Sequence, residues 1–322
     1  MQRYIDYLSS KADNHIIAYG LGDWFDIGPE RPGESQLTSN GVTATAIYYY
    51  DVTLMEKMAN LLGKPDDARK YQELAARIKQ AFNRTFWNPS TRTYDRNSQA
   101  ANAVALYMGL TTPENRQQVF DNLIADIRGR NNALTAGDVG YRYVLRALEA
   151  GGASDVIYDM NCKYDTPGYG WQLAHGATAL TESWQAYGFV SNNHFMLGHL
   201  MEWLFSGLGG IRQKEDSFGF KHIVIKPEPV GDVRDAQVSY ESPYGQIVSD
   251  WKDNDKEFII RVEVPANSKA SVYLPSADTK QITESGVRLE DVPGISCKQE
   301  GNRYVVATTG SGTYTFKVKK NK

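Results

Sequence analysis

Two stretches of the sequence combine carboxylates with aromatic side chains in surroundings that are typical of loops. Residues 164–184 include Glu182, which lies two residues before Trp184 in the chain. Residues 20–34 hold too many glycines and prolines for a helix. Hydrolysis of a glycosidic bond needs an acid for the leaving oxygen and a second carboxylate as base or nucleophile, and aromatic rings offer flat apolar surfaces to sugars. The pattern therefore predicts a candidate carbohydrate site. The carboxylates and aromatic residues of the 20–34 loop are Asp23, Trp24, Phe25, Asp26, Glu30 and Glu34.

Each of these residues also has a purely structural interpretation. An aromatic, partly desolvated setting raises the pKa of a carboxyl group, which makes Glu182 a candidate proton donor or acceptor. A Glu on a helix surface or at a hairpin cap would read the same way. His194, which follows the polar residues 191–193, fits a helix cap or a core position as well as a ligand. The 20–34 loop also fits a solvated loop whose aromatic residues anchor it.

Composition excludes several classes of function. The 322 residues include 35 Lys and Arg against 38 Asp and Glu, a formal net charge of -3, which argues against a nucleic-acid partner. No apolar run reaches the roughly 18 residues of a membrane helix, and the N-terminus does not resemble a secretory signal, so we expect no membrane partner and leave the compartment open. Cys162 and Cys297 fit no metal or disulfide spacing, and no phosphate-binding loop is present, so we expect no metal and no cofactor.

The elements that must position these residues change in character near residue 212. Residues 1–212 show helical periodicity and no strand signal of comparable strength. Several links are short, which predicts neighbouring helices packed as antiparallel hairpins. We therefore expect residues 1–212 to be all-α and to form the catalytic domain. The expected helices span 42–62, 68–82, 98–108, 113–127, 138–150, 153–161 and 194–205.

Residues 213–322 read as a second, all-β domain. Short segments alternate or are rich in β-branched residues, and turn signals separate them. This spacing predicts an antiparallel β-sandwich, to which we assign a structural role. The expected strands span 222–225, 236–240, 246–251, 257–264, 270–274 and 304–318.

Several motifs make the chain resemble a known family, the bacterial α-L-rhamnosidases of glycoside hydrolase family 78. Each motif is weak by itself, but together they follow the order of the family. The segment after residue 212 is similar to the family's C-terminal sandwich. The motifs are Gly22-Asp23-Trp24, Asn97-Ser98-Gln99-Ala100, Leu134-Thr135-Ala136-Gly137, Gly176-Ala177-Thr178 with Glu182 and Trp184, and Asn193-His194-Phe195 followed by Glu202-Trp203.

The resemblance implies an (α/α)6 toroid and an inverting hydrolase that removes terminal α-L-rhamnose from rhamnose-containing carbohydrates. Glu182 matches the family's general base, and His194 matches a histidine that hydrogen-bonds sugar hydroxyls. Further residues near the motifs match substrate-binding positions, with Trp87 and Trp171 the looser matches. These residues are Asp23, Trp24, Trp87 and Trp171.

The chain also departs from the family pattern. Thr181 precedes Glu182 where the family has Trp. The family's general acid belongs to a motif upstream of the Gly-Asp-Trp loop, and this sequence has no such motif, so Glu30 and Glu34 are candidates for a substitute acid. We count fewer helices than six hairpins need, so we expect an incomplete barrel. Self-association or an upstream fragment could cover its open edge.

Two other functions therefore stay open from the sequence. The first is a rhamnose-binding or inactive fragment that lacks catalysis, because the acid is missing. The second is a different (α/α)6 glycosidase, such as a glucoamylase-like hydrolase.

Overall fold

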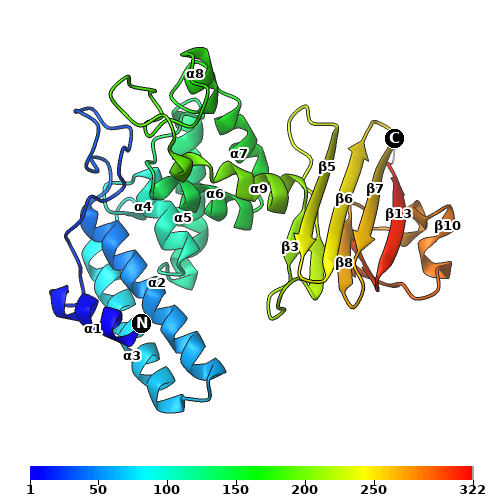
Figure 1. Ribbon diagram of the computed structural model, residues 1–322, viewed down its shortest axis with the longest axis horizontal. Coiled ribbons are helices and arrows are strands. Elements are labelled where there is room, and N and C mark those ends of the chain that lie inside the picture. The colour runs from blue at the N-terminus through cyan, green and yellow to red at the C-terminus, as the bar shows by residue number, and fades with distance from the viewer. Residues whose placement is uncertain (321–322) are drawn as a thin grey trace. The chain divides into compact units, whose positions relative to one another are not determined.

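The computed structural model describes residues 1–320, which divide by their contacts into a helical unit, Met1–Leu200, and a β-unit that begins at Met201 (Figure 1). The first strand of the β-unit, β3, spans Ile211–Gln213. The domain boundary at residue 212 stays a prediction from the change between helical and strand-like sequence patterns.

The helical unit consists of hairpins joined by short links. The second and third helices lie antiparallel and are connected by three residues, as the links predicted (Figure 1). Six of the seven expected helices are present with shifted ends. The helices are α1 (Gln2–Lys11), α2 (Asn40–Leu61), α3 (Pro65–Phe86), α4 (Gln99–Tyr107), α5 (Pro113–Gly129), α6 (Gly140–Ala150), α7 (Ser154–Asn161) and α8 (Tyr169–Ala174).

The sequence explains both a surface helix and a central one. α3 begins with Pro65 and carries two carboxylates in its first turn, where they interact favourably with the positive end of the helix dipole. Its buried residues, among them Tyr71 and Ile78, lie on one face. α4 is buried from Gln99 to Leu106, and the side chain of Ser98 caps it by accepting a hydrogen bond from the amide of Ala101 at 3.0 Å.

The expected helix over 194–205 is the exception. The chain forms a 3₁₀ turn at Phe195–Leu197, a short helix α9 at Leu200–Trp203 and a π-turn at Leu204–Leu208. Glycines at 198 and 207 weaken a continuous helix because glycine costs about 1 kcal/mol relative to alanine in a helix interior. Three further elements of the helical unit are not predicted from the sequence. They are α1, α8 and the small hairpin of β1 (Trp87–Asn88) and β2 (Thr93–Tyr94).

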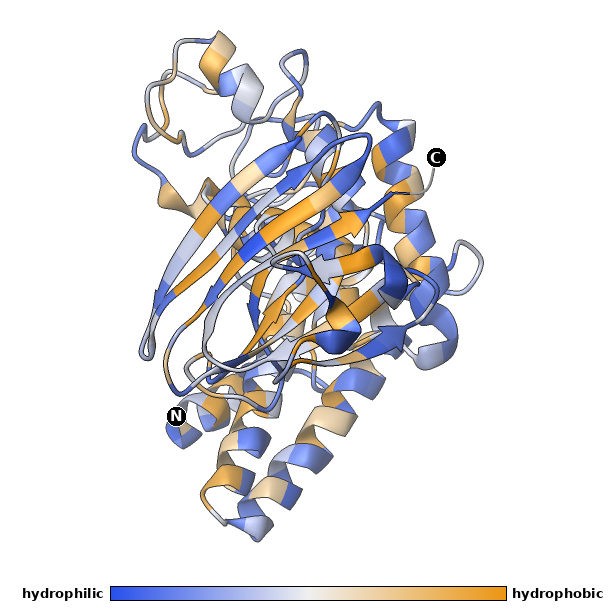
Figure 2. Cartoon of the chain, turned by 90° about the vertical axis from the view of Figure 1, so that its right-hand side faces the viewer, coloured by the Kyte–Doolittle hydropathy of each residue, from blue (hydrophilic) through white to orange (hydrophobic). Residues whose placement is uncertain are grey.

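The β-unit is a sandwich of a six-stranded and a five-stranded sheet. One hydrophobic cluster draws on both sheets and includes Trp251, Phe258 and Phe316. Buried and partly exposed residues alternate along Glu257–Val264, as the sequence pattern predicts. Figure 2 shows hydrophobic and hydrophilic residues mixed along the strands.

The strand order is β10-β9-β13-β7-β6-β5 in one sheet and β11-β12-β8-β4-β3 in the other. All described pairs are antiparallel except β4 with β8. The expected segment 304–318 is two strands, because the turn at its Gly-Ser-Gly sequence reverses the chain. The remaining strands are β4 (His222–Ile225), β5 (Asp235–Ser242), β6 (Gly245–Asp253), β7 (Glu257–Val264), β8 (Lys269–Leu274), β9 (Ile282–Glu284), β10 (Val287–Arg288), β11 (Ser296–Glu300), β12 (Tyr304–Thr309) and β13 (Gly312–Lys319).

Among residues 1–320, none of the helices is both long enough and apolar enough to cross a membrane.

Candidate active site

The Gly-Asp-Trp loop is fixed to the start of α6 by a buried carboxylate. Asp23 is fully buried, and its two oxygens accept hydrogen bonds from the amides of Gly140 at 2.6 Å and Gly137 at 2.9 Å. A Cβ atom at Gly137 would lie 2.1 Å from the carbonyl oxygen of Trp24, so only glycine permits this approach. In this structure Asp23 holds the loop, and its expected role in substrate binding stays a prediction.

Burial has a marked electrostatic effect on Asp23. Loss of hydration raises the pKa of Asp23 to about 7, and the nearby carboxylates of Asp26 and Asp138 add to the increase. The two amide donors at Gly137 and Gly140 favour the ionised form and oppose it. Desolvation is the larger effect, so the loop anchor titrates near neutral pH.

A second buried carboxylate fixes the other side of the same loop. Asp26 accepts hydrogen bonds from the amides of Gln36 at 2.9 Å and Leu37 at 2.7 Å, and from the hydroxyl of Ser35 at 3.1 Å. The interpretation of a solvated loop anchored by aromatic residues is therefore incomplete. Its first two carboxylates are buried anchors, and Phe25 is buried with them.

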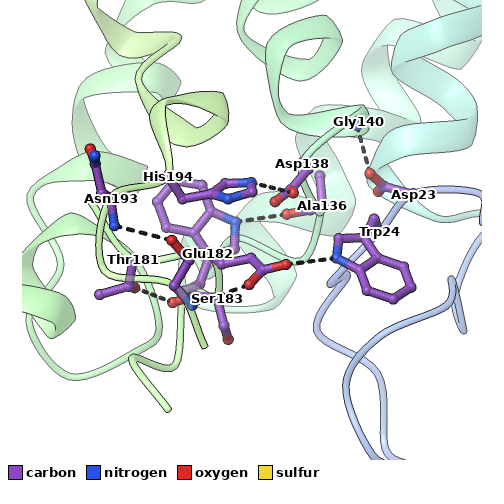
Figure 3. A network of polar contacts seen from close by, with 12 residues as sticks. Asp23, Trp24, Ala136, Asp138, Gly140, Thr181, Glu182, Ser183, Asn193 and His194 are labelled. Carbon is purple, nitrogen blue, oxygen red and sulfur yellow. Dashed lines mark hydrogen bonds and ion pairs between the residues drawn. The ribbon is translucent and has the colours of Figure 1, made fainter. Parts of the chain in front are cut away.

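Glu182 lies at the centre of the site and is held at both oxygens. The indole Nε1 of Trp24 donates to its Oε1 at 3.2 Å, and the amide of Ser191 donates to its Oε2 at 3.2 Å (Figure 3). Its own amide donates to the carbonyl of Ser191 at 2.9 Å. The side chain is half-buried, so the carboxylate is oriented and keeps some access to solvent.

An aromatic cluster supports this segment. Trp184 is buried and donates from Nε1 to the carbonyl of Ala136 at 3.0 Å. Its ring meets Tyr141 and Tyr169 edge-on, with centroids 4.8 and 5.2 Å away. Trp184 is therefore a packing residue, and its contact with Ala136 fixes the segment that carries Glu182 to the loop before α6.

A carboxylate–histidine pair lies beside Glu182. His194 Nε2 is 2.8 Å from Asp138 Oδ2 (Figure 3). Burial raises the pKa of Asp138 to about 6, His194 opposes the increase, and the charge of Glu182 adds to it. Sequence reasoning missed Asp138, because an Asp at the start of a helix reads as a dipole partner. Its place in the run after Leu134-Thr135-Ala136-Gly137 was the available signal.

Two of the expected substrate-binding aromatic residues make other contacts. Trp87 packs on Tyr94 within the β1–β2 hairpin, with ring centroids 5.2 Å apart. Trp171 stacks on His175 at 4.0 Å and donates from Nε1 to the carbonyl of Gln185 at 3.2 Å. Their predicted roles in sugar binding stay predictions.

The two expected substitute acids are exposed. Glu34 accepts a hydrogen bond from Nδ2 of Asn40 at 2.6 Å, and the backbone amide of Glu30 donates to Oε1 of Gln36 at 2.7 Å. Neither contact involves the residues around Glu182. Within residues 1–320, no group of three His, Cys, Asp or Glu side chains is arranged to hold a metal ion.

Helical hairpins that carry a carboxylate among aromatic side chains are followed in the chain by a β-sandwich, and family models assign these two parts to a six-hairpin glycosidase domain and a C-terminal domain. Two family models match the chain and agree. The bacterial alpha-L-rhamnosidase 6 hairpin glycosidase domain matches residues 1–208, and the bacterial alpha-L-rhamnosidase C-terminal domain matches residues 210–288. The chain belongs to the bacterial α-L-rhamnosidase family, glycoside hydrolase family 78.

Individual relatives agree with this assignment. An α-L-rhamnosidase of Streptomyces avermitilis is 29% identical over 98% of this chain and 30% of its own length. The structure of α-L-rhamnosidase from Dictyoglumus thermophilum has a TM-score of 0.89 and 30% identity, covering 99% of this chain and 36% of that one. The Streptomyces avermitilis enzyme complexed with L-rhamnose has a TM-score of 0.86 and 26% identity, covering 98% of this chain and 30% of that one. The chain thus spans about a third of the length of these relatives.

Proposed function

We propose that this chain carries the base-bearing part of an α-L-rhamnosidase site and acts on terminal α-L-rhamnose by inversion. The observation that supports this most strongly is the position of Glu182. Its carboxylate is oriented by the Trp24 indole and the Ser191 amide, although Trp24 lies 158 residues away in the chain. Two motifs of the family thus meet at one carboxylate.

In the proposed reaction, Glu182 accepts a proton from the water that attacks the anomeric carbon, whose bond to the leaving oxygen breaks. A good leaving group such as para-nitrophenolate departs without a proton, whereas a poorer one needs a general acid, for which Glu30 and Glu34 are the candidate substitutes. Trp24 offers its ring to the sugar while its Nε1 orients Glu182. His194 binds a sugar hydroxyl. Asp23 acts on the sugar indirectly, because its contacts with the amides of Gly137 and Gly140 set the position of the adjacent Trp24 backbone.

A second candidate function is rhamnose binding without turnover of ordinary rhamnosides. The positions of Glu30 and Glu34 favour it, because both are exposed and Glu34 is hydrogen-bonded to Asn40. A positioned acid contributes roughly 10²- to 10⁴-fold to the rate of such reactions. A site with a base and sugar contacts alone would hydrolyse only substrates with a good leaving group.

The test compares the chain with its Glu182→Gln variant on para-nitrophenyl α-L-rhamnoside, whose leaving group needs little acid assistance. We expect turnover that falls by roughly 10²- to 10⁴-fold in the variant. Glu73→Gln is the matched control, because Glu73 is an exposed residue on α3 that pairs with Arg77 one turn further along the helix.

The outcomes separate the two functions. Turnover that survives Glu182→Gln would remove Glu182 from the proposed role. If neither protein turns over but calorimetry detects L-rhamnose binding, the binding function replaces the catalytic one. If neither turnover nor binding occurs, both proposals fail for this chain.

A further inference from the structure

Asp138 is connected to both loops that form the site. Its backbone amide donates to the carbonyl of Trp24 at 2.8 Å, and its carboxylate oxygen Oδ2 lies 2.8 Å from His194 Nε2. It stands just before α6, the helix whose first amide also binds Asp23. The residue is only 5% exposed. Asp138 thus contacts Trp24 through its backbone and His194 through its side chain, so it links the two loops.

The contact also decides which nitrogen of His194 carries the proton. An ionised carboxylate can only accept a hydrogen bond, so Nε2 must donate to Asp138. The second ring nitrogen, Nδ1, has no hydrogen-bond partner among residues 1–320. In the neutral ring, Nδ1 is then the acceptor, and it is the nitrogen left for a ligand.

We propose that Asp138 is a positioning residue of this site, which holds the His194 ring in the Nε2–H form so that Nδ1 accepts a hydrogen bond from a sugar hydroxyl. This inference rests on the proposed function, because the hydroxyl belongs to the bound rhamnose. It adds to that function a residue whose carboxylate does not touch the sugar.

The surroundings of Asp138 fit a role in orienting its neighbour. Oδ1 is buried and has no partner among the described residues, so one oxygen alone serves the contact with His194. The charged groups that face Asp138 are His194 and Glu182 from one segment and Asp23 from the other loop. Among these groups, His194 is the one within hydrogen-bond distance of the Asp138 carboxylate in the described part of the chain.

The first test reads the histidine directly and needs no sugar. Nitrogen-15 NMR of the imidazole rings distinguishes the Nε2–H and Nδ1–H forms, and the His194 signal is assigned by its absence in His194→Gln. We expect His194 to be in the Nε2–H form in the parent chain and to gain Nδ1–H form in Asp138→Asn, since an amide can also donate to Nε2. An Nδ1–H form in the parent chain would overturn the proposal even if the variant does not fold.

The second test asks whether Asp138 acts through His194. L-rhamnose binding is measured by calorimetry for the parent chain, Asp138→Asn, His194→Gln and the double variant. The hydrogen bond from His194 to the Asp138 carboxylate is charge-assisted, and such bonds are about twice as strong as neutral ones. Asp138→Asn replaces it with a neutral bond and leaves the His194 ring less firmly oriented, so we expect L-rhamnose binding to weaken by about tenfold. The double variant should bind no more weakly than His194→Gln alone.

Losses that multiply in the double variant would show that Asp138 acts independently of His194 and would overturn the proposal. Asp126→Asn is the matched control, because Asp126 is largely buried and pairs with Arg130 at the end of α5. It should bind as the parent does. A parent chain that neither binds nor hydrolyses rhamnosides contradicts the proposed function, and the NMR result then still decides the role of Asp138.

Discussion

The two loops that meet at Glu182 are held in opposite ways. Residues 20–34 are fixed by the buried carboxylates of Asp23 and Asp26, which bind backbone amides outside the loop. Residues 175–199 combine a contact within the segment, Glu182 with Ser191, with side-chain contacts of Trp184 and His194 to the residues before α6. They also expose large apolar side chains, with Phe195 80% exposed. Because Trp24 donates to Glu182, the loop that the buried carboxylates hold helps to orient the carboxylate of the other loop.

The largest effect on stability should come from the titration of Asp23, the buried carboxylate that holds the 20–34 loop. The pKa of Asp23 is raised from 3.8 to about 7 in the folded chain by burial. Between these values the folded state binds more protons than the unfolded state, so the stability that Asp23 contributes falls as pH rises from about 4 to 7. The change amounts to at most about 4 kcal/mol. Urea unfolding at pH 5, 6 and 7.5 measures it.

Asp23→Asn cannot titrate, so we expect it to flatten this slope relative to the parent. Asp66→Asn, at an exposed position on α3, should leave the slope unchanged. Equal slopes in the parent and Asp23→Asn would mean that the anchor is ionised throughout, and the contrast between the two loops would lose its electrostatic part.

A steric change should break the same anchor without altering charge. Gly137→Ala places a Cβ 2.1 Å from the Trp24 carbonyl oxygen, and overpacking of this kind costs typically about 1–3 kcal/mol. We expect stability to fall by about the upper value and rhamnose binding to be lost, because the loop must move. Gly129→Ala, which meets nothing within 4 Å, should not destabilise the chain. Unchanged binding in Gly137→Ala would show that the loop position is not needed.

The smallest effect should come from cutting the link between the loops. Trp24→Phe keeps an aromatic ring but removes the N–H that donates to Glu182. A hydrogen bond to a charged group contributes about 1.5–3 kcal/mol, so we expect roughly a tenfold loss in kcat/KM with stability nearly unchanged. Hydrolysis of para-nitrophenyl α-L-rhamnoside and urea unfolding measure the two quantities. A large loss of stability instead would make Trp24 an anchor of the fold.

The strands and most helices could be predicted because their burial follows a simple period. The alternation over Glu257–Val264 matches the observed strand at both ends, and the apolar face of α3 follows the helical spacing. The last helix could not be predicted with the same rule. Its apolar residues continue through 194–205, but Gly198 interrupts the pattern and the chain leaves the helix there.

Within the candidate site, motif order predicts that Trp24 and Glu182 belong to one site, and the structure has a hydrogen bond between them, while their chemical roles stay predictions. The burial of Asp23 could not be inferred, because carboxylates are rarely fully buried and its amide partners lie more than 110 residues away, at separations of 114 and 117. Trp87 and Trp171 illustrate the converse limit. An aromatic residue type does not reveal whether the ring packs on a neighbour or faces a ligand.

The expected self-association, or pairing with an upstream fragment, also stays a prediction. Large apolar side chains on the helical unit, such as Tyr4, Tyr7, Leu61 and Leu62, are at least half exposed, which is the kind of surface that such a partner would cover.

The distance along the chain between Trp24 and Glu182 has a consequence for how the molecule assembles. Closing a chain loop of 158 residues in one step carries an entropy cost of about 4–5 kcal/mol. The contact between Trp184 and Ala136 closes only 48 residues, and the Asp23 contacts bring the first loop to the same place. Once both have formed, the indole and the carboxylate are neighbours at little further cost. Long-range contacts of this kind slow folding, so we infer that the site is among the last features of the helical unit to form.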